Sequence, residues 1–144
     1  MGTHQEREGS RVTRVAVYGS LRRGFGNHGL LEDSLFIGEA LTEARYTMLH
    51  LGGFPGVVKK GNTSITVELY DVDEETLRRL DRLEGHPGFY ERLPVKVLPV
   101  NADQTDAPQA WEWVSMYLLP NDWDGAAIET GDWARRTLPA ALRA

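Results

Sequence analysis

The sequence predicts a small α+β protein, built as a mostly antiparallel, closed or nearly closed β-barrel of six or seven short strands with few flanking helices. The first observation is a series of short segments in which apolar and polar residues alternate, most clearly residues 64–72 and 93–100. The second is that only residues 73–84 have the pattern of a convincing helix. With so few helices, strands and helices cannot alternate as a doubly wound parallel sheet requires.

Length and composition favour one globular domain. The chain has 144 residues, of which 41% are hydrophobic and 26% charged, and this suits a single core. We expect a loose tail over residues 1–12 and one domain over residues 13–144. The chain has no cysteine, which excludes disulfides, thiolate nucleophiles and cysteine-based zinc sites.

Charge and hydropathy restrict the classes of partner that this chain is expected to bind. The formal net charge of −5 argues against a general nucleic-acid binder, which is expected to be basic. No apolar run approaches the roughly 20 residues of a membrane span. The first fourteen residues lack the apolar core of a signal peptide. We therefore expect a cytoplasmic protein without a membrane or nucleic-acid partner, and its oligomeric state stays open.

The remaining elements are short. Further strands are expected over residues 13–18, 35–41, 45–51 and 111–119, with a short extended piece at 57–58 before a turn at 59–62. Helical turns are expected at residues 27–31 and over residues 133–142, and residues 101–109 form a polar loop.

The helix over residues 73–84 ends with a carboxylate on its apolar side. Asp73 can cap its N-terminus, and Gly85 fits the position just past its end. Glu84 lies about 20° from Leu77 on the helical wheel and four residues after Leu80. One interpretation is a partly buried acid with a raised pKa, suited to proton transfer near neutral pH. The other is a frayed helix end whose glutamate turns to water.

A glycine-rich segment follows the first strand. The strand ends at Gly19 and Ser20, and three more glycines follow at positions 24, 26 and 29. Such a turn can present backbone N–H groups to an anion or to a developing oxyanion, or it can be an ordinary β-turn. Residues 24–29 match G-x-G-x-x-G, but they lie too far from the strand for a dinucleotide-binding loop.

The other polar residues are mostly expected to be exposed to solvent. Glu68 alternates with apolar neighbours and is expected to face solvent, with a second acid beside Glu84 as the alternative. The pair Arg22 and Arg23 is attributed to a solvated loop. No histidine pair has the spacing of metal ligands, and no metal site or organic cofactor is expected.

Two signatures in this chain resemble the γ-glutamylcyclotransferase-like proteins, a family that includes the AIG2-like proteins and γ-glutamylamine cyclotransferase. The first is Tyr18-Gly19-Ser20-Leu21, followed by Arg23-Gly24, Asn27 and Leu30-Leu31. The second is Leu80-Asp81-Arg82-Leu83-Glu84, followed by Pro87 and by Tyr90-Glu91-Arg92. Weaker similarities occur at Phe54-Pro55-Gly56-Val57 and at Gly131-Asp132-Trp133. The resemblance runs well over residues 15–92 and loosely beyond.

The resemblance implies a fold with a cavity at one end and an activity of the transferase or lyase type. It implies cleavage of a γ-glutamyl amide by the substrate's own α-amine, which gives 5-oxoproline and a free amine. It assigns the general base to Glu84 and substrate binding to Tyr18, Gly19, Ser20, Leu21 and Tyr90. The alternative is a non-catalytic module that binds a small molecule in the same cavity. The sequence leaves the amine unspecified.

Overall fold

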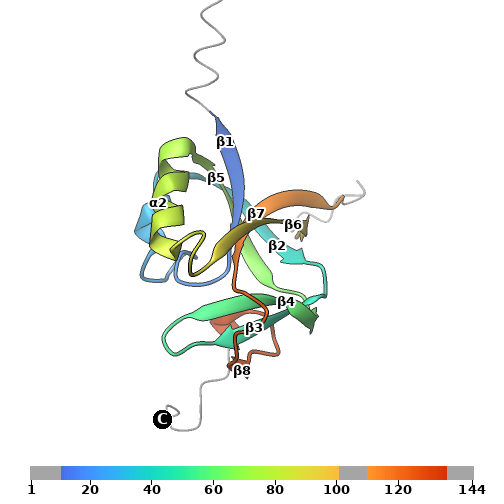
Figure 1. Ribbon diagram of the computed structural model, residues 1–144. Coiled ribbons are helices and arrows are strands. Elements are labelled where there is room, and N and C mark those ends of the chain that lie inside the picture. The colour runs from blue at the N-terminus through green and yellow to red at the C-terminus, as the bar shows by residue number, and fades with distance from the viewer. Residues whose placement is uncertain (1–10, 101–109, 136–144) are drawn as a thin grey trace, which may run out of the picture.

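A computed structural model describes residues 11–100 and 110–135 of the chain (Figure 1). The polar loop over residues 101–109, almost all of the expected tail, and the end of the helix expected over residues 133–142 lie outside this part. Within it, no helix is long and apolar enough to cross a membrane.

Five strands form a closed barrel, so the expected α+β class and the mostly antiparallel barrel are confirmed. Around the barrel their order is β1-β5-β2-β6-β7, and they comprise Val12–Val17, Thr66–Asp73, Leu35–Thr42, Glu91–Pro99 and Glu112–Leu118. The pairs are antiparallel except for β1 and β7, which close the barrel in parallel with Val15 opposite Ser115.

The barrel has five strands rather than six or seven because three others form a separate sheet. These are β3 (Tyr46–His50), β4 (Pro55–Thr63) and β8 (Ala126–Ala127), in the order β4-β3-β8. Figure 1 shows this sheet beneath the barrel. The turn expected at residues 59–62 is a register shift within β4, where Tyr46 pairs with Thr63 and Thr47 with Val58.

The helix α2 (Glu74–Glu84) forms as its sequence predicts. The Asp73 side chain accepts a hydrogen bond of 2.8 Å from the Thr76 backbone N–H at the N-terminus. Gly85 ends the helix with a φ of 68°, which a residue without a side chain adopts readily. Leu80 is fully buried, whereas Leu77 is half-buried against the same core.

Apolar side chains fill two layers, one inside the barrel and one outside it. Ala16, Val67 and Leu69 point into the barrel interior. Val15 and Tyr70, on the opposite faces of β1 and β5, pack in a second cluster with residues of α2 and of the 3-10 turn His28–Leu31. Both faces of these two strands are therefore buried.

This second layer overturns the expectation for Glu68. Glu68 lies on the face of β5 that alternates away from the barrel interior, but the loop after β1 and its 3-10 turn cover that face. Its side chain is only 5% exposed. The alternation predicted the right face, and the covering loop, which the alternation does not encode, removes that face from water.

Candidate functional site

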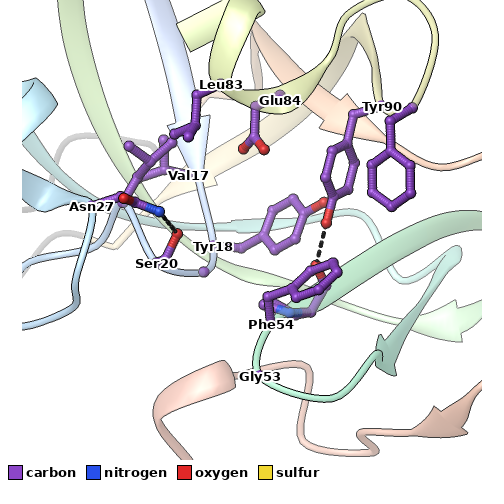
Figure 2. Close-up of a pocket in the computed structure, with 13 residues that line it drawn as sticks. Val17, Tyr18, Ser20, Asn27, Gly53, Phe54, Leu83, Glu84 and Tyr90 are labelled. Atoms are coloured by element: carbon purple, nitrogen blue, oxygen red, sulfur yellow. Dashed lines mark hydrogen bonds between the residues drawn. The ribbon is translucent and has the colours of Figure 1, made fainter.

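A cavity of about 350 Å³ lies where the end of β1, the end of α2 and the start of β4 meet (Figure 2). All six residues expected at the site line it: Tyr18, Gly19, Ser20, Leu21, Glu84 and Tyr90. The structure therefore brings together the two sequence signatures, which begin at Tyr18 and at Leu80. Phe54 and Asn27, noted only as parts of weaker or longer motifs, also line the cavity.

Glu84 ends α2 with its side chain directed into this cavity, toward Tyr18 and Tyr90 (Figure 2). The helix is closed beyond it, because the His86 N–H donates to the Asp81 carbonyl oxygen at 2.9 Å, and so the frayed end is not observed. Within the described residues, its carboxylate has no hydrogen bond or ion pair. Burial raises the pKa of Glu84 from 4.5 to about 7. At neutral pH the group can therefore both accept and return a proton.

Two tyrosines form the wall next to Glu84. The Tyr90 hydroxyl donates to the Pro55 carbonyl oxygen at 2.6 Å, and the Tyr18 hydroxyl donates to the Tyr117 carbonyl oxygen at 2.6 Å. Burial, together with the nearby Glu84 charge, raises the pKa of both phenols well above its ordinary value. Both stay protonated at neutral pH, so they position the wall and do not serve as bases.

The turn after β1 is held in shape by its own hydrogen bonds. The Gly19 carbonyl oxygen accepts from the Arg22 N–H at 3.0 Å, and the Ser20 carbonyl oxygen accepts from the Asn27 N–H at 2.9 Å. The Asn27 side-chain amide also donates to the Ser20 hydroxyl at 2.8 Å (Figure 2). Among the described residues, the backbone N–H groups of Ser20 and Leu21 have no acceptor. Because both residues line the cavity, these N–H groups are candidates for binding an anionic group there.

A buried ionic cluster anchors this turn. Arg22 donates to Asp132 at 2.7 Å and lies 3.5 Å from Glu68. Glu68 also accepts from the Arg23 backbone N–H and from the Tyr70 hydroxyl, each at 2.9 Å. Glu68 is thus paired with arginine and not with Glu84, and Arg22 is buried rather than in a solvated loop.

The sequence patterns did not predict this ionic cluster, and the reason is physical. Its members are spread over the chain from residue 22 to residue 132, and only the folded barrel brings them together. The one signal was the weak Gly131-Asp132-Trp133 pattern, which carries the Asp132 side chain. Within the described residues, no group of three or more histidines or carboxylates is placed to hold a metal ion.

The chain matches known proteins over the same region. The model of the family described as gamma-glutamyl cyclotransferase, AIG2-like, matches residues 15–135. Protein MJ1514 of Methanocaldococcus jannaschii is 41% identical over 121 residues, which are 83% of this chain and 93% of that protein. Gamma-glutamylcyclotransferase family protein YtfP of Escherichia coli K12 is 35% identical over 124 residues, covering 85% of this chain and 97% of YtfP.

Solved structures share the fold. The crystal structure of a mouse AIG2-like protein superimposes with a TM-score of 0.67 and 26% identity, covering 77% of this chain and 79% of that one. An uncharacterized protein from Pyrococcus horikoshii, PH0828, gives a TM-score of 0.63 with 30% identity, covering 84% and 89%. With the barrel, the cavity and both signatures in place, the chain belongs to the AIG2-like gamma-glutamyl cyclotransferase family.

Proposed function

We propose that this chain cleaves γ-glutamyl amides to 5-oxoproline and a free amine, with Glu84 as the proton shuttle. One observation supports this above all: the Glu84 carboxylate is partly buried in the cavity without a hydrogen bond or ion pair among the described residues. A buried carboxylate is normally paired, because its desolvation is costly. An unpaired one with a pKa near 7 suits a group kept for proton transfer.

The reaction rearranges the substrate without adding water. The α-amine nitrogen attacks the γ-carbonyl carbon, a C–N bond forms, and a five-membered ring closes. The amide C–N bond then breaks and the amine departs. Starting from the ammonium form, two protons leave the attacking nitrogen and two reach the departing nitrogen. Glu84 carries them in turn and ends as the carboxylate it began as.

The turn at Gly19–Leu21 supplies the second part of the proposed mechanism. The free N–H groups of Ser20 and Leu21 are suited to bind the glutamyl carboxylate or to stabilise the oxyanion that forms during attack. The cavity walls hold the glutamyl chain folded so that amine and carbonyl meet. Ordering of this kind can remove roughly 7–11 kcal/mol of a barrier.

The experiment that tests this is a mass-spectrometric screen of γ-glutamyl amides for release of 5-oxoproline. Glu84→Gln keeps the shape and removes the base, so turnover is expected to fall about 10²–10⁴-fold. Glu75→Gln, on an exposed turn of the same helix, is the matched control and is expected to retain parental turnover. Equal turnover by folded Glu84→Gln protein contradicts the role of Glu84. If no amide is cleaved but one binds, the chain is a binding module.

A further inference from the structure

Three half-exposed aromatic side chains lie along or beside the cavity, and we call them the aromatic rim: Phe54, Phe89 and Trp123. Phe54 and Phe89 line the cavity, with ring centroids 6.4 Å apart. Trp123 contacts Phe89 edge-on at 5.1 Å. The three are 40%, 38% and 38% exposed. Aromatic surface gathered in water at one place is typical of a binding site.

The rim is held in place by its neighbours. The Phe89 N–H donates to the Gly85 carbonyl oxygen at 2.8 Å, and the Phe89 ring meets the buried Tyr90 ring edge-on at 4.9 Å. Figure 2 shows Phe54 and Tyr90 on one side of the cavity and Ser20 on the other, with Glu84 between them. A glutamyl head bound at the Ser20 turn therefore leaves the amine portion on the side of the rim.

Size and charge restrict what that portion can be. The cavity, at about 350 Å³, is at the small end of the roughly 300–1,000 Å³ of ligand pockets, so a large amine extends across the rim. Glu84 is the one charged residue among the described residues that line the cavity, and no lysine, arginine or histidine is among them. A carboxylate on the amine portion would find no cation there and would face the Glu84 charge.

We infer that the preferred substrates are γ-glutamyl amides of amines that carry an aromatic ring and no carboxylate. This inference rests on the proposed function and adds the class of amine. The substrate ring packs edge-to-face or offset against Phe54 and Phe89, as aromatic pairs prefer, and removes water from the mouth of the cavity. Phe54, Phe89 and Trp123 then determine specificity without touching the reacting atoms.

Three amides test the inference: those of phenethylamine, ethylamine and phenylalanine. The ethylamide lacks the ring, and the phenylalanine conjugate adds a carboxylate. Dissociation constants are measured by calorimetry with Glu84→Gln protein, and kcat/KM is measured with the parental protein through 5-oxoproline release. The phenethylamide is expected to exceed each of the other two by about tenfold or more in both measurements.

Rim variants show whether the aromatic rim is the source of the preference. The double substitution Phe54→Leu with Phe89→Leu keeps the surface apolar and removes both rings, so the ratio of phenethylamide to ethylamide is expected to fall below about threefold. Trp113→Leu is the control, since Trp113 is 63% exposed and does not line this cavity. It is expected to keep the parental ratio.

The outcomes distinguish the preference for an aromatic amine from the proposed cleavage reaction. Equal affinity of Glu84→Gln protein for the phenethylamide and the ethylamide overturns the inference, whether or not the parental protein turns either one over. A parental ratio that survives loss of both rim phenylalanines overturns it as well. Tighter binding of the phenethylamide with no release of 5-oxoproline from any amide supports the ring preference and rejects the proposed reaction.

Discussion

The Tyr90 hydroxyl donates a hydrogen bond of 2.6 Å to the backbone carbonyl oxygen of Pro55. This bond joins the loop after α2 to the start of β4, the two segments that form one wall of the cavity. Tyr90 is 6% exposed, so little water reaches the pair. A carbonyl group left unpaired at such a place costs free energy.

Tyr90→Phe is therefore expected to lower the free energy of unfolding by about 1–3 kcal/mol, measured by urea denaturation. Tyr46→Phe is the matched control, because Tyr46 is also buried and its hydroxyl has no hydrogen-bond partner among the described residues. That change is expected to stay within about 0.5 kcal/mol. Equal effects of the two substitutions would show that the Tyr90 bond does not stabilise the wall.

Gly19, in the turn after β1, lies against the Pro55 ring at the start of β4. A Cβ atom at position 19 would stand 2.8 Å from Cγ of the Pro55 ring, closer than packed carbon atoms allow. Gly19→Ala must therefore push the β1 turn and the start of β4 apart. We expect a loss of about 1–3 kcal/mol in the free energy of unfolding, together with weaker binding of γ-glutamyl amides.

Gly26→Ala provides the control for that substitution. Gly26 belongs to the same loop, but a Cβ atom there would have no heavy atom within 4 Å. Its backbone is also outside the positive-φ region that restricts side chains. Thermal denaturation of both variants, with calorimetry on a γ-glutamyl amide, separates the close contact from a general need for glycine. Parental behaviour of Gly19→Ala would contradict the prediction.

Arg22, in the turn after β1, forms ion pairs with two carboxylates, Glu68 and Asp132. Arg22→Met keeps an unbranched chain but leaves the buried Glu68 without a cation and leaves Asp132 only its exposed contact with Arg135 at 3.7 Å. We expect a loss of about 3–5 kcal/mol, the usual result of removing one partner from a buried pair. The exposed pair of Arg79 and Glu75 offers a control, because Arg79→Met is expected to change stability by less than about 1 kcal/mol. Similar losses in chemical denaturation would show that burial of the cluster does not matter.

The sequence was a good guide where local pattern decides the structure. The cap at Asp73, the stop at Gly85 and the placement of Glu84 on the apolar side of α2 all depend on residues within one helix, and all three are observed. The alternation in β5 likewise predicted which residues point into the barrel.

Contacts between distant segments were the part that could not be predicted. The same alternation in β5 placed Glu68 in water because it does not show that the loop after β1 and its 3-10 turn cover the outer face of the strand. The number of barrel strands was wrong because strand patterns do not show which strands pair, and β3 pairs with β4 and β8 in a separate sheet. The aromatic rim forms only when Trp123 reaches Phe89.

The raised pKa of Glu84 also makes folding depend on pH. The group titrates near pH 7 in the folded protein, against an ordinary value of 4.5, so between these values the folded chain binds more protons than the unfolded chain. The free energy of unfolding therefore falls as pH rises through this range. Glu84→Gln lacks this charge. Its stability relative to the parental protein is expected to improve from pH 5 to pH 8 by up to about 3 kcal/mol, measured by urea denaturation at each pH.

Under the proposed mechanism, the same titration is expected to set the pH dependence of activity. Only the deprotonated carboxylate can accept the proton of the α-ammonium group, so kcat/KM is expected to fall about tenfold per pH unit below the Glu84 pKa of about 7. The residual activity of Glu84→Gln protein should lack this acidic limb, because the titrating group has been removed. Glu75→Gln, whose glutamate is exposed on the same helix, should keep it. Rates of 5-oxoproline release between pH 5 and 8 decide the matter. An acidic limb that persists unchanged in Glu84→Gln protein would assign the titration to another group and remove Glu84 from the proton transfer.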